Sequence, residues 1–271
     1  FALGPLCGIS DADVVIEAND LCDRLGMDTI SAGNVVAFAM ACCERGLIDA
    51  DFRFGDGEFL VRLLRLIARR EGIGDVLAEG VRRASQKIKG AEPIAVHCKG
   101  LEPPGYDPRG LKGVALAYAV SPRGACHLRH VAYRSNMAGR HPFEDEAIDR
   151  LSFRGQAKLV WDSEVFYTFA DSLVICRFLS LPVDGPVLWG EALKAFKACT
   201  GLELDKSRAI ELCAGICRRI DRFNEACGLP AYDLSPRFHE PLKRGASKGQ
   251  SVLKGEFEEA LREYLRLKSG F

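Results

Sequence analysis

Apolar residues recur every three or four positions along most of the chain. The first clear stripe at this spacing consists of Val14, Ala18, Leu21 and Leu25. Residues 10–13 (Ser-Asp-Ala-Asp) before the stripe resemble a capping box, and Gly26 after it is a typical helix stop. Because side chains three or four apart share one face of an α-helix, the pattern predicts a first helix that ends at Gly26.

The same spacing predicts eight further helices. They cover residues 31–45, 57–71, 75–88, 111–120, 154–171, 191–200, 207–227 and 256–268. Strand-like alternation is scarce, and residues 94–97 (Ile-Ala-Val-His) are the single short strand candidate. The predicted fold class is therefore all-α and multihelical.

A Pro/Gly-rich stretch over residues 100–113 interrupts the helical pattern. Clustered prolines and glycines mark loops rather than helices or strands. The stretch therefore predicts a domain junction, with one helical subdomain over residues 1–104 and a second over residues 105–271. We expect the two subdomains to pack around a cleft.

Composition excludes some partners. The chain has 271 residues, 37 of them acidic and 37 basic, so its formal net charge is zero. A neutral chain has no overall field that attracts nucleic acid or an anionic membrane, and no apolar run approaches the roughly 18 residues that a membrane span needs. We expect neither partner. The neutral surface leaves a monomer and a homodimer equally open.

Eleven cysteines are many for this length, and the odd number argues against a complete disulfide framework. Cys22, Cys42 and Cys199 stand beside apolar residues, which favours small buried side chains in a reducing, cytoplasmic compartment. Cys213 and Cys217 lie one helical turn apart. No matching Cys or His pair completes a metal site with them, so core positions are favoured over a half-site.

Cys176 ends an apolar run and is followed by Arg177. A neighbouring cation favours the thiolate, which is the form that ligates iron. A single cysteine cannot hold an iron–sulfur cluster, so a buried structural thiol is the alternative interpretation.

The segment around Cys176 echoes an earlier one. Asp171 precedes Cys176 by the same spacing that separates Asp23 from Asp28. Asp23 also lies in the last turn of the first predicted helix, where the helix dipole disfavours an anion. Such a local misfit predicts a partner outside that helix.

Three further residues are candidates for proton transfer. Glu17 lies at the border of the first apolar stripe, where a solvated carboxylate is the alternative interpretation. His127 and His130 end the segment Ala-Val-Ser-Pro-Arg-Gly-Ala-Cys-His-Leu-Arg-His. Imidazole titrates nearest neutrality, but two structural histidines would give the same pattern.

Taken together and in order, these segments resemble the tungsten/molybdenum aldehyde:ferredoxin oxidoreductase family, and specifically its two helical C-terminal domains, 2 and 3. The similarity is carried by residues 23–34, 106–110, 119–130, 169–178, 216–224, 234–238 and 245–249. In the family motif D-x-x-G-L-C, Val174 stands at the glycine position. The motif C-x-x-C-x-x-x-C of the family is absent. The resemblance therefore implies that the parent protein has a separate N-terminal cofactor-binding domain.

The resemblance implies an oxidoreductase that converts aldehydes to carboxylic acids. The implied cofactors are a tungsten or molybdenum bis-molybdopterin and a [4Fe–4S] cluster, and ferredoxin is the implied electron acceptor. Asp23, Asp28 and Asp171 would bind the two pterins, and Cys176 would be the fourth cluster ligand. Without the N-terminal domain, we expect the isolated chain to be metal-free and inactive.

The resemblance also implies that a glutamate and a histidine near the metal handle protons. Glu17, expected in a buried cavity, and His127 are assigned these roles, with His130 as the alternative histidine and Cys126 as a structural residue. Two other functions stay open at this point. One is a tungsten enzyme of the same family with another substrate, such as an aromatic acyl-CoA that it reduces. The other is a cofactor-free helical interaction protein.

Overall fold

The computed structural model describes residues 1–180 and 185–270. All its regular elements in that part of the chain are helices, joined by loops and two isolated bridges. This confirms the all-α, multihelical prediction. Within the described residues, no single helix is long and apolar enough to cross a membrane, although two helices that meet at a bend of 117° (Ala12–Leu25 and Thr29–Glu44) pass the same test as a pair.

Contacts divide the chain into two units, which are described separately. Unit 1 comprises Phe1–Gly105, Arg123–Ala125 and Leu234–Arg237. Unit 2 comprises Tyr106–Pro122, Cys126–Asp233 and Phe238–Phe271. Two short segments that follow residue 105 in the sequence thus belong to unit 1, so no single boundary in the sequence separates the units.

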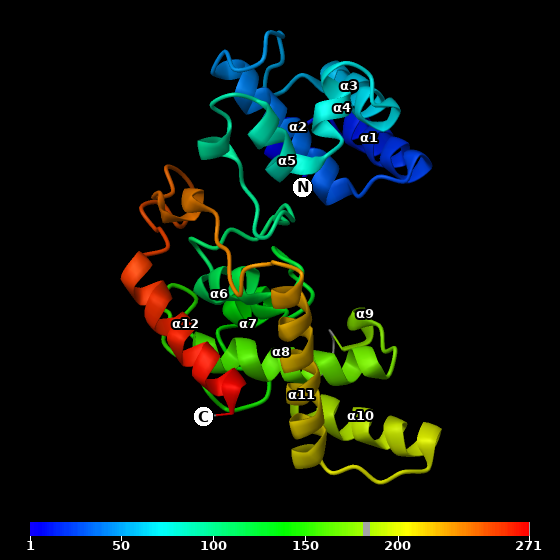
Figure 1. The fold of residues 1–271 in the computed structure, drawn as a ribbon, viewed down its shortest axis with the longest axis vertical. Helices are drawn as coiled ribbons and strands as arrows, with labels where there is room; N and C mark the ends of the chain where they lie inside the picture. The colour runs from blue at the N-terminus through cyan, green and yellow to red at the C-terminus, as the bar shows by residue number, and fades with distance from the viewer. Residues whose placement is uncertain (181–184, 271) are drawn as a thin grey trace. The chain divides into compact units, whose positions relative to one another are not determined.

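Unit 1 is a cluster of helices around a common core (Figure 1). Its elements are η1 (Pro5–Cys7), α1 (Ala12–Leu25), α2 (Thr29–Glu44), α3 (Gly57–Arg69), α4 (Ile73–Leu77), α5 (Gly80–Lys87) and η2 (Glu92–Ile94). Helix α2 is buried along most of its length, with Val36, Ala39 and Met40 fully enclosed. At Gly33 the backbone around Ala2 comes so close that a Cβ would lie 2.4 Å from its carbonyl. Only glycine fits at this contact.

Two predictions for unit 1 are wrong in detail. The predicted helix 75–88 is two helices, because the chain turns at Gly80 with a positive φ of 79°. The buried carboxylate of Glu102 accepts a hydrogen bond from the Val81 amide at 2.7 Å and another from the Ser31 hydroxyl at 2.9 Å. It thereby caps the new helix start and ties it to α2. The strand expected over 94–97 does not form.

Unit 2 is built around one long helix, α8 (Gln156–Ser172), which packs against α6 (Lys112–Val120), α11 (Lys206–Ala226) and α12 (Lys254–Ser269). Figure 1 shows α11 and α12 lying across α8. The remaining elements are α7 (Ala132–Ala138), α9 (Arg177–Ser180), α10 (Gly185–Thr200) and η3 (Pro236–His239), whose last residues alone belong to this unit. Helices α7 and α9 were not predicted, because both are too short to show a periodic pattern.

Most cysteines lie where the sequence predicts. Cys213 and Cys217 are buried core residues, as are Cys22 and Cys42. The prediction for Cys199 is wrong, since its thiol is exposed on α10. All the cysteines of the described residues are free thiols. A buried thiol is hard to ionise, and burial raises the pKa of Cys213 to about 11.

Candidate cofactor-binding site

Asp23 and Asp28 flank the turn between α1 and α2 in unit 1. Helix α1 ends at Gly26, which adopts a left-handed φ of 69°, and α2 starts at once. Asp28 is the residue that caps α2, and its Oδ1 accepts a hydrogen bond from the Ser31 amide at 2.7 Å. The sequence pattern showed the helix stop at Gly26 but not this capping role. The first helix is likewise capped by Asp11, one residue after the expected Ser10.

The partner of Asp23 lies on its own helix. Oδ2 of Asp23 accepts a hydrogen bond from Nδ2 of Asn19, one turn earlier, at 3.3 Å. The prediction placed this partner outside the helix, whereas the structure provides one hydrogen-bond donor to Asp23 from within α1. Both Asp23 and Asp28 are exposed. Within the described residues, Oδ1 of Asp23 and Oδ2 of Asp28 have no partner and can accept further hydrogen bonds.

Glu17 does not lie in a buried cavity of unit 1. Its side chain is 58% exposed, and its Oε1 lies 3.6 Å from Nη2 of Arg65 on α3. Unit 1 by itself therefore does not form the cavity expected around this residue. An exposed ion pair of this kind contributes little energy, and unit 1 by itself shows no contact that would give Glu17 a proton-transfer role.

Asp171 lies at the end of α8 in unit 2 and is held by two arginines. Nη2 of Arg177 lies 2.7 Å from Oδ2 of Asp171, and Nη1 of Arg129 lies 3.2 Å from the same oxygen. Oδ1 has no partner within the described residues. The arginines thus fix the carboxylate in place while leaving one oxygen available.

The loop after α8 carries the chain from Asp171 to Cys176. Val174 adopts a left-handed φ of 57°, which is rare for a β-branched residue. The amide of Ile175 then donates to the carbonyl of Ala170 at 2.9 Å, which closes the turn. This glycine-like backbone conformation lies at the position where the family motif has glycine. A glycine would adopt this backbone conformation without strain.

The thiol of Cys176 is exposed, at the start of α9. This contradicts the alternative interpretation of a buried structural thiol. Cys176 also lines a pocket of about 260 Å³ whose walls include Phe166, Ile175 and Leu188. The neighbouring guanidinium of Arg177 lies 4.2 Å above the Tyr167 ring, so the cation expected beside this cysteine is held rigidly by Tyr167 and Asp171.

The two candidate histidines have different environments. His127 is half-buried beside the stacked rings of Tyr106 and Tyr133, at centroid distances of 5.7 Å and 6.1 Å. His130 is 1% exposed, and neither ring nitrogen has a hydrogen-bond partner. Its Nε2 lies 3.8 Å from Oε2 of Glu164. Burial lowers the pKa of His130, so it is neutral. His127 is the more accessible of the two.

The structure also contains a buried charged network that the sequence analysis missed. Glu164, at the centre of α8, accepts a hydrogen bond from the Tyr264 hydroxyl and lies 3.2 Å from Nζ of Lys268. Arg129 approaches the same carboxylate at 3.9 Å and donates to the Thr168 hydroxyl at 2.7 Å. Burial opposes ionisation of Glu164, but Lys268 and the other donors outweigh it and hold its pKa below the usual range.

One signal in the sequence pointed to this network. The polar residues of α8 do not gather on one face, so a glutamate near its centre is expected to be buried and then needs a partner. The identity of the partner could not be read from the pattern, because Lys268 lies 104 residues away.

No group of three or more His, Cys, Asp or Glu side chains in the part of the chain that the structure describes has the arrangement of a metal site. Cys176 could therefore contribute one ligand to a cluster whose other ligands come from elsewhere. The three aspartates, each with a free oxygen, could accept hydrogen bonds from a ligand rich in amine and amide donors.

The comparisons with known proteins agree on one family. The family model described as "Aldehyde ferredoxin oxidoreductase, domains 2 & 3" matches residues 1–269. The tungsten-containing aldehyde ferredoxin oxidoreductase of Pyrococcus furiosus is 32% identical over 279 residues, which are 99% of this chain and 44% of that protein. The corresponding protein of Thermococcus kodakarensis is 32% identical over 286 residues, with the same coverage.

A more distant relative and a solved structure with a similar fold have other substrates in their names. The WOR-like subunit of an aliphatic sulfonate oxidoreductase from P. furiosus is 28% identical over 289 residues, covering 97% of this chain and 41% of that subunit. The BamBC active-site complex of benzoyl coenzyme A reductase with 1,5-dienoyl-CoA shares the fold, with a TM-score of 0.74 and 21% identity over 96% of this chain and 44% of that one. The chain thus spans less than half the length of each of these relatives.

Proposed function

Because the chain belongs to the aldehyde ferredoxin oxidoreductase family, we propose that it is the helical part of an oxidoreductase that converts aldehydes to carboxylic acids and reduces ferredoxin. The observation that carries the proposal is a match that runs unbroken over residues 1–269. The matched residues include every segment that holds Asp23, Asp28, Asp171 and Cys176. The parent protein then supplies the remaining length of the relatives, including a cofactor-binding domain.

The three aspartates fit the role of pterin ligands. Each carboxylate has one oxygen fixed by a hydrogen bond or ion pair, and within the described residues the other oxygen is free. Pterin rings present amine and amide donors, which a fixed carboxylate accepts without losing much side-chain entropy. In this proposal Asp23, Asp28 and Asp171 each contribute hydrogen-bond acceptors to the binding of a tungsten or molybdenum bis-pterin.

Cys176 fits the role of one cluster ligand. Its thiol is exposed, and its neighbour Arg177 is a cation held in place by Asp171. The remaining ligands of a [4Fe–4S] cluster would come from the N-terminal domain. When bound, the metal–pterin and the cluster accept two electrons from the substrate and pass them on singly to ferredoxin.

His127 is the residue of this chain that we propose to carry a proton during the reaction. It is half-buried, and its imidazole lies against the rings of Tyr106 and Tyr133. His130 is enclosed in the core with no hydrogen-bond partner, so it cannot exchange protons readily with a substrate. The structure therefore favours His127 over His130 for this role.

The proposal is tested on the full-length parent protein, purified without oxygen. We expect tungsten or molybdenum and iron to co-purify with it, and ferredoxin to be reduced when an aldehyde is added. Asp171→Asn should lower the metal content and the activity. Asp145→Asn, a matched change at an exposed loop position, should alter neither. A parent protein that is fully folded but metal-free would overturn the proposal in favour of a cofactor-free helical protein.

The identity of the substrate is the part of the proposal that the relatives restrict least. An aliphatic sulfonate oxidoreductase subunit is 28% identical, so the same helical domains also occur in proteins named for other substrates. A second candidate is therefore a tungsten enzyme of this family that acts on a substrate other than an aldehyde, including an aromatic acyl-CoA. A substrate panel on the full-length enzyme separates the two, with ferredoxin reduction as the common readout.

A further inference from the structure

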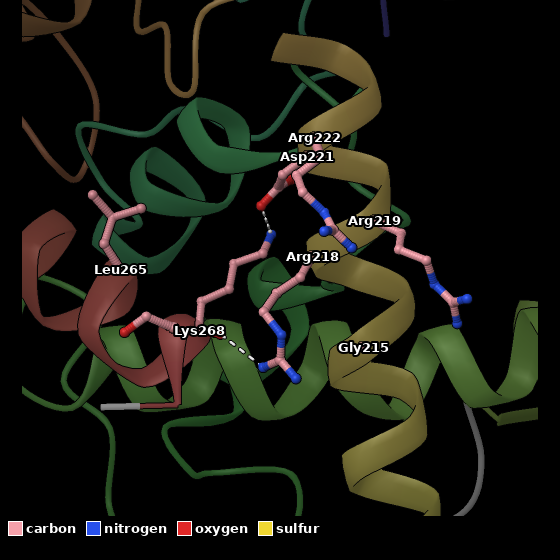
Figure 2. Close-up of a pocket in the computed structure, with 8 residues that line it drawn as sticks. Gly215, Arg218, Arg219, Asp221, Arg222, Leu265 and Lys268 are labelled. Carbon is pink, nitrogen blue, oxygen red and sulfur yellow. Dashed lines mark hydrogen bonds and ion pairs between the residues drawn. The ribbon is translucent and has the colours of Figure 1, made fainter. Parts of the chain in front are cut away.

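We propose that a pocket between α11 and α12 of unit 2 binds a ligand that carries a diphosphate group. The pocket has a volume of about 660 Å³, and four of its eight lining residues are basic (Figure 2). It lies apart in sequence from Asp171 and Cys176, and the inference does not rest on the proposed oxidoreductase function.

Three guanidinium groups give the pocket its charge. Arg218, Arg219 and Arg222 all line it. Arg218 donates to the backbone carbonyl of Lys268 at 3.1 Å, and no carboxylate of the described residues pairs with any of the three arginines. Since the whole chain has a net charge of zero, this local excess of positive charge marks an anion site rather than a general property of the surface.

The one carboxylate that lines the pocket is already neutralised. Oδ2 of Asp221 lies 2.8 Å from Nζ of Lys268, and Figure 2 shows this pair between the two helices. Lys268 is itself buried and also lies 3.2 Å from Glu164. Burial opposes the charge of Lys268, but Glu164 and Asp221 outweigh it and raise its pKa. Asp221 therefore repels an incoming anion only weakly.

The spacing of the arginines indicates two adjacent anionic groups. Arg218 and Arg222 lie one turn apart on α11, which places their Cβ atoms about 6 Å from each other on one face of the helix. A guanidinium binds phosphate oxygens in a two-pronged fashion. Two such groups at this spacing match the two phosphates of a diphosphate better than a single phosphate.

The size of the pocket indicates that the diphosphate belongs to a larger molecule. A volume of about 660 Å³ lies in the range of pockets that hold small organic ligands. Leu265 of α12 adds an apolar side chain to the wall opposite α11. The pocket therefore fits an organic diphosphate, such as a nucleoside diphosphate, and the free diphosphate ion is the alternative source of the same chemistry.

Calorimetric titration of the full chain tests this inference, with ADP, inorganic diphosphate and inorganic phosphate as the three probes. We expect ADP and diphosphate to bind, and phosphate to bind at least tenfold more weakly. Arg222→Gln should weaken the binding of diphosphate by about tenfold or more, the usual effect of losing a charged hydrogen bond. Arg218→Gln combined with Arg222→Gln should abolish measurable binding.

Arg262→Gln is the matched control, because it removes the same charge from an exposed position on α12 outside the pocket. It should leave all three affinities unchanged. Arg222 is exposed and makes no hydrogen bond or ion pair with the described residues, so a thermal melt of Arg222→Gln should match that of the wild type. No binding of diphosphate to the wild type, or equal losses in Arg222→Gln and Arg262→Gln, would overturn the inference. Equal affinities for ADP and diphosphate would restrict it to the free ion.

Discussion

The guanidinium of Arg177 lies 2.7 Å from Oδ2 of Asp171. Arg177 directly follows Cys176, so this ion pair connects the last turn of α8 to the start of α9. One ion pair thus fixes both a proposed pterin ligand and the start of the helix beside a proposed cluster ligand. Its position explains how a loop of a few residues can present two different cofactor contacts in a fixed arrangement.

This ion pair predicts the effect of Arg177→Gln in the full-length enzyme. Arg129 alone would then hold Asp171, from 3.2 Å, and the carboxylate would be less rigidly placed. We expect the tungsten or molybdenum content to fall several-fold, measured by elemental analysis of the purified protein. Arg154→Gln, at an exposed position before α8, is the control. Unchanged metal content in Arg177→Gln would remove Arg177 as a positioning residue.

The left-handed backbone at Val174 predicts an unusual stabilising substitution. A left-handed conformation costs a residue with a Cβ about 1–2 kcal/mol, and Val174 is 91% exposed, so its side chain contributes little packing. Val174→Gly should raise the free energy of unfolding by about 0.5–1 kcal/mol after the entropic cost of glycine is subtracted. Urea denaturation of the chain measures this.

Val174→Ala is the matched control for that substitution. Alanine retains the Cβ that causes the strain, so its free energy of unfolding should stay within about 0.5 kcal/mol of the wild type. If glycine and alanine had the same effect, the strain at Val174 would not be the cause.

The buried network predicts a large effect of Glu164→Gln. Lys268 would keep its charge in the core with Asp221 as its remaining carboxylate partner. Breaking a buried ion pair by removing one partner typically costs about 3–5 kcal/mol, and we expect a loss of this size in urea denaturation at pH 7. Glu144→Gln, which breaks the exposed pair with Lys158, should cost less than about 1 kcal/mol.

The same network predicts how stability depends on acid. The folded-state pKa of Glu164 is depressed, so its contribution is complete above the unfolded-state value of about 4.3 and is lost as the pH falls below it. The free energies of unfolding of the wild type and of Glu164→Gln should therefore become more similar as the pH is lowered from 5 to 3. A difference that stays constant over this range would contradict the assignment.

His130 predicts a separate step at higher pH. Burial and the nearby cations Arg129 and Lys268 depress its folded-state pKa, although Glu164 opposes them. The unfolded chain then binds a proton below about pH 6.5 that the folded chain excludes, so stability falls with acid. In His130→Phe, the free energy of unfolding should fall less steeply between about pH 6.5 and 5 than it does in the wild type. Measurements at pH 8, where His130 is neutral in both states, provide the reference.

The exposure of Cys176 predicts a labelling test for the cluster. In the isolated chain, Cys176, Cys199 and Cys227 are exposed and should react quickly with a thiol reagent. Cys7 should not react, because burial raises its pKa to about 12. In the full-length enzyme with its iron in place, Cys176 should be protected while Cys199 still reacts. Rapid labelling of Cys176 in the iron-loaded enzyme would exclude it as a ligand. Mass spectrometry of the peptides reports each site.

The exposed position of Glu17 predicts that the residue is dispensable for the chemistry. Glu17→Gln in the full-length enzyme removes only a 3.6 Å surface pair with Arg65. We expect turnover and metal content within about twofold of the wild type, since surface ion pairs contribute little energy. A turnover lowered by orders of magnitude with full metal content would restore Glu17 as a proton carrier.

The sequence alone determined the helices and the family. Apolar spacing is a local property, so it predicted α1, α2, α3, α6, α8, α11 and α12 within a few residues of their observed ends. It failed where a local pattern is too short, as at α7, or where a contact from far along the chain intervenes, as at the Glu102 cap that splits α4 from α5. The order of the family-like motifs along the chain, which indicated the family, could also be read from the sequence alone.

Only the tertiary structure decided which of the candidate groups are buried, paired or free. The sequence could not show that Glu164 meets Lys268, or that Arg129 reaches Asp171 from 42 residues away. It placed Glu17 in a cavity, whereas α3 brings Arg65 to it at the surface. The physical reason is that burial and charge pairing depend on which helix faces pack together, and that choice is made by the whole core rather than by the residues beside each group.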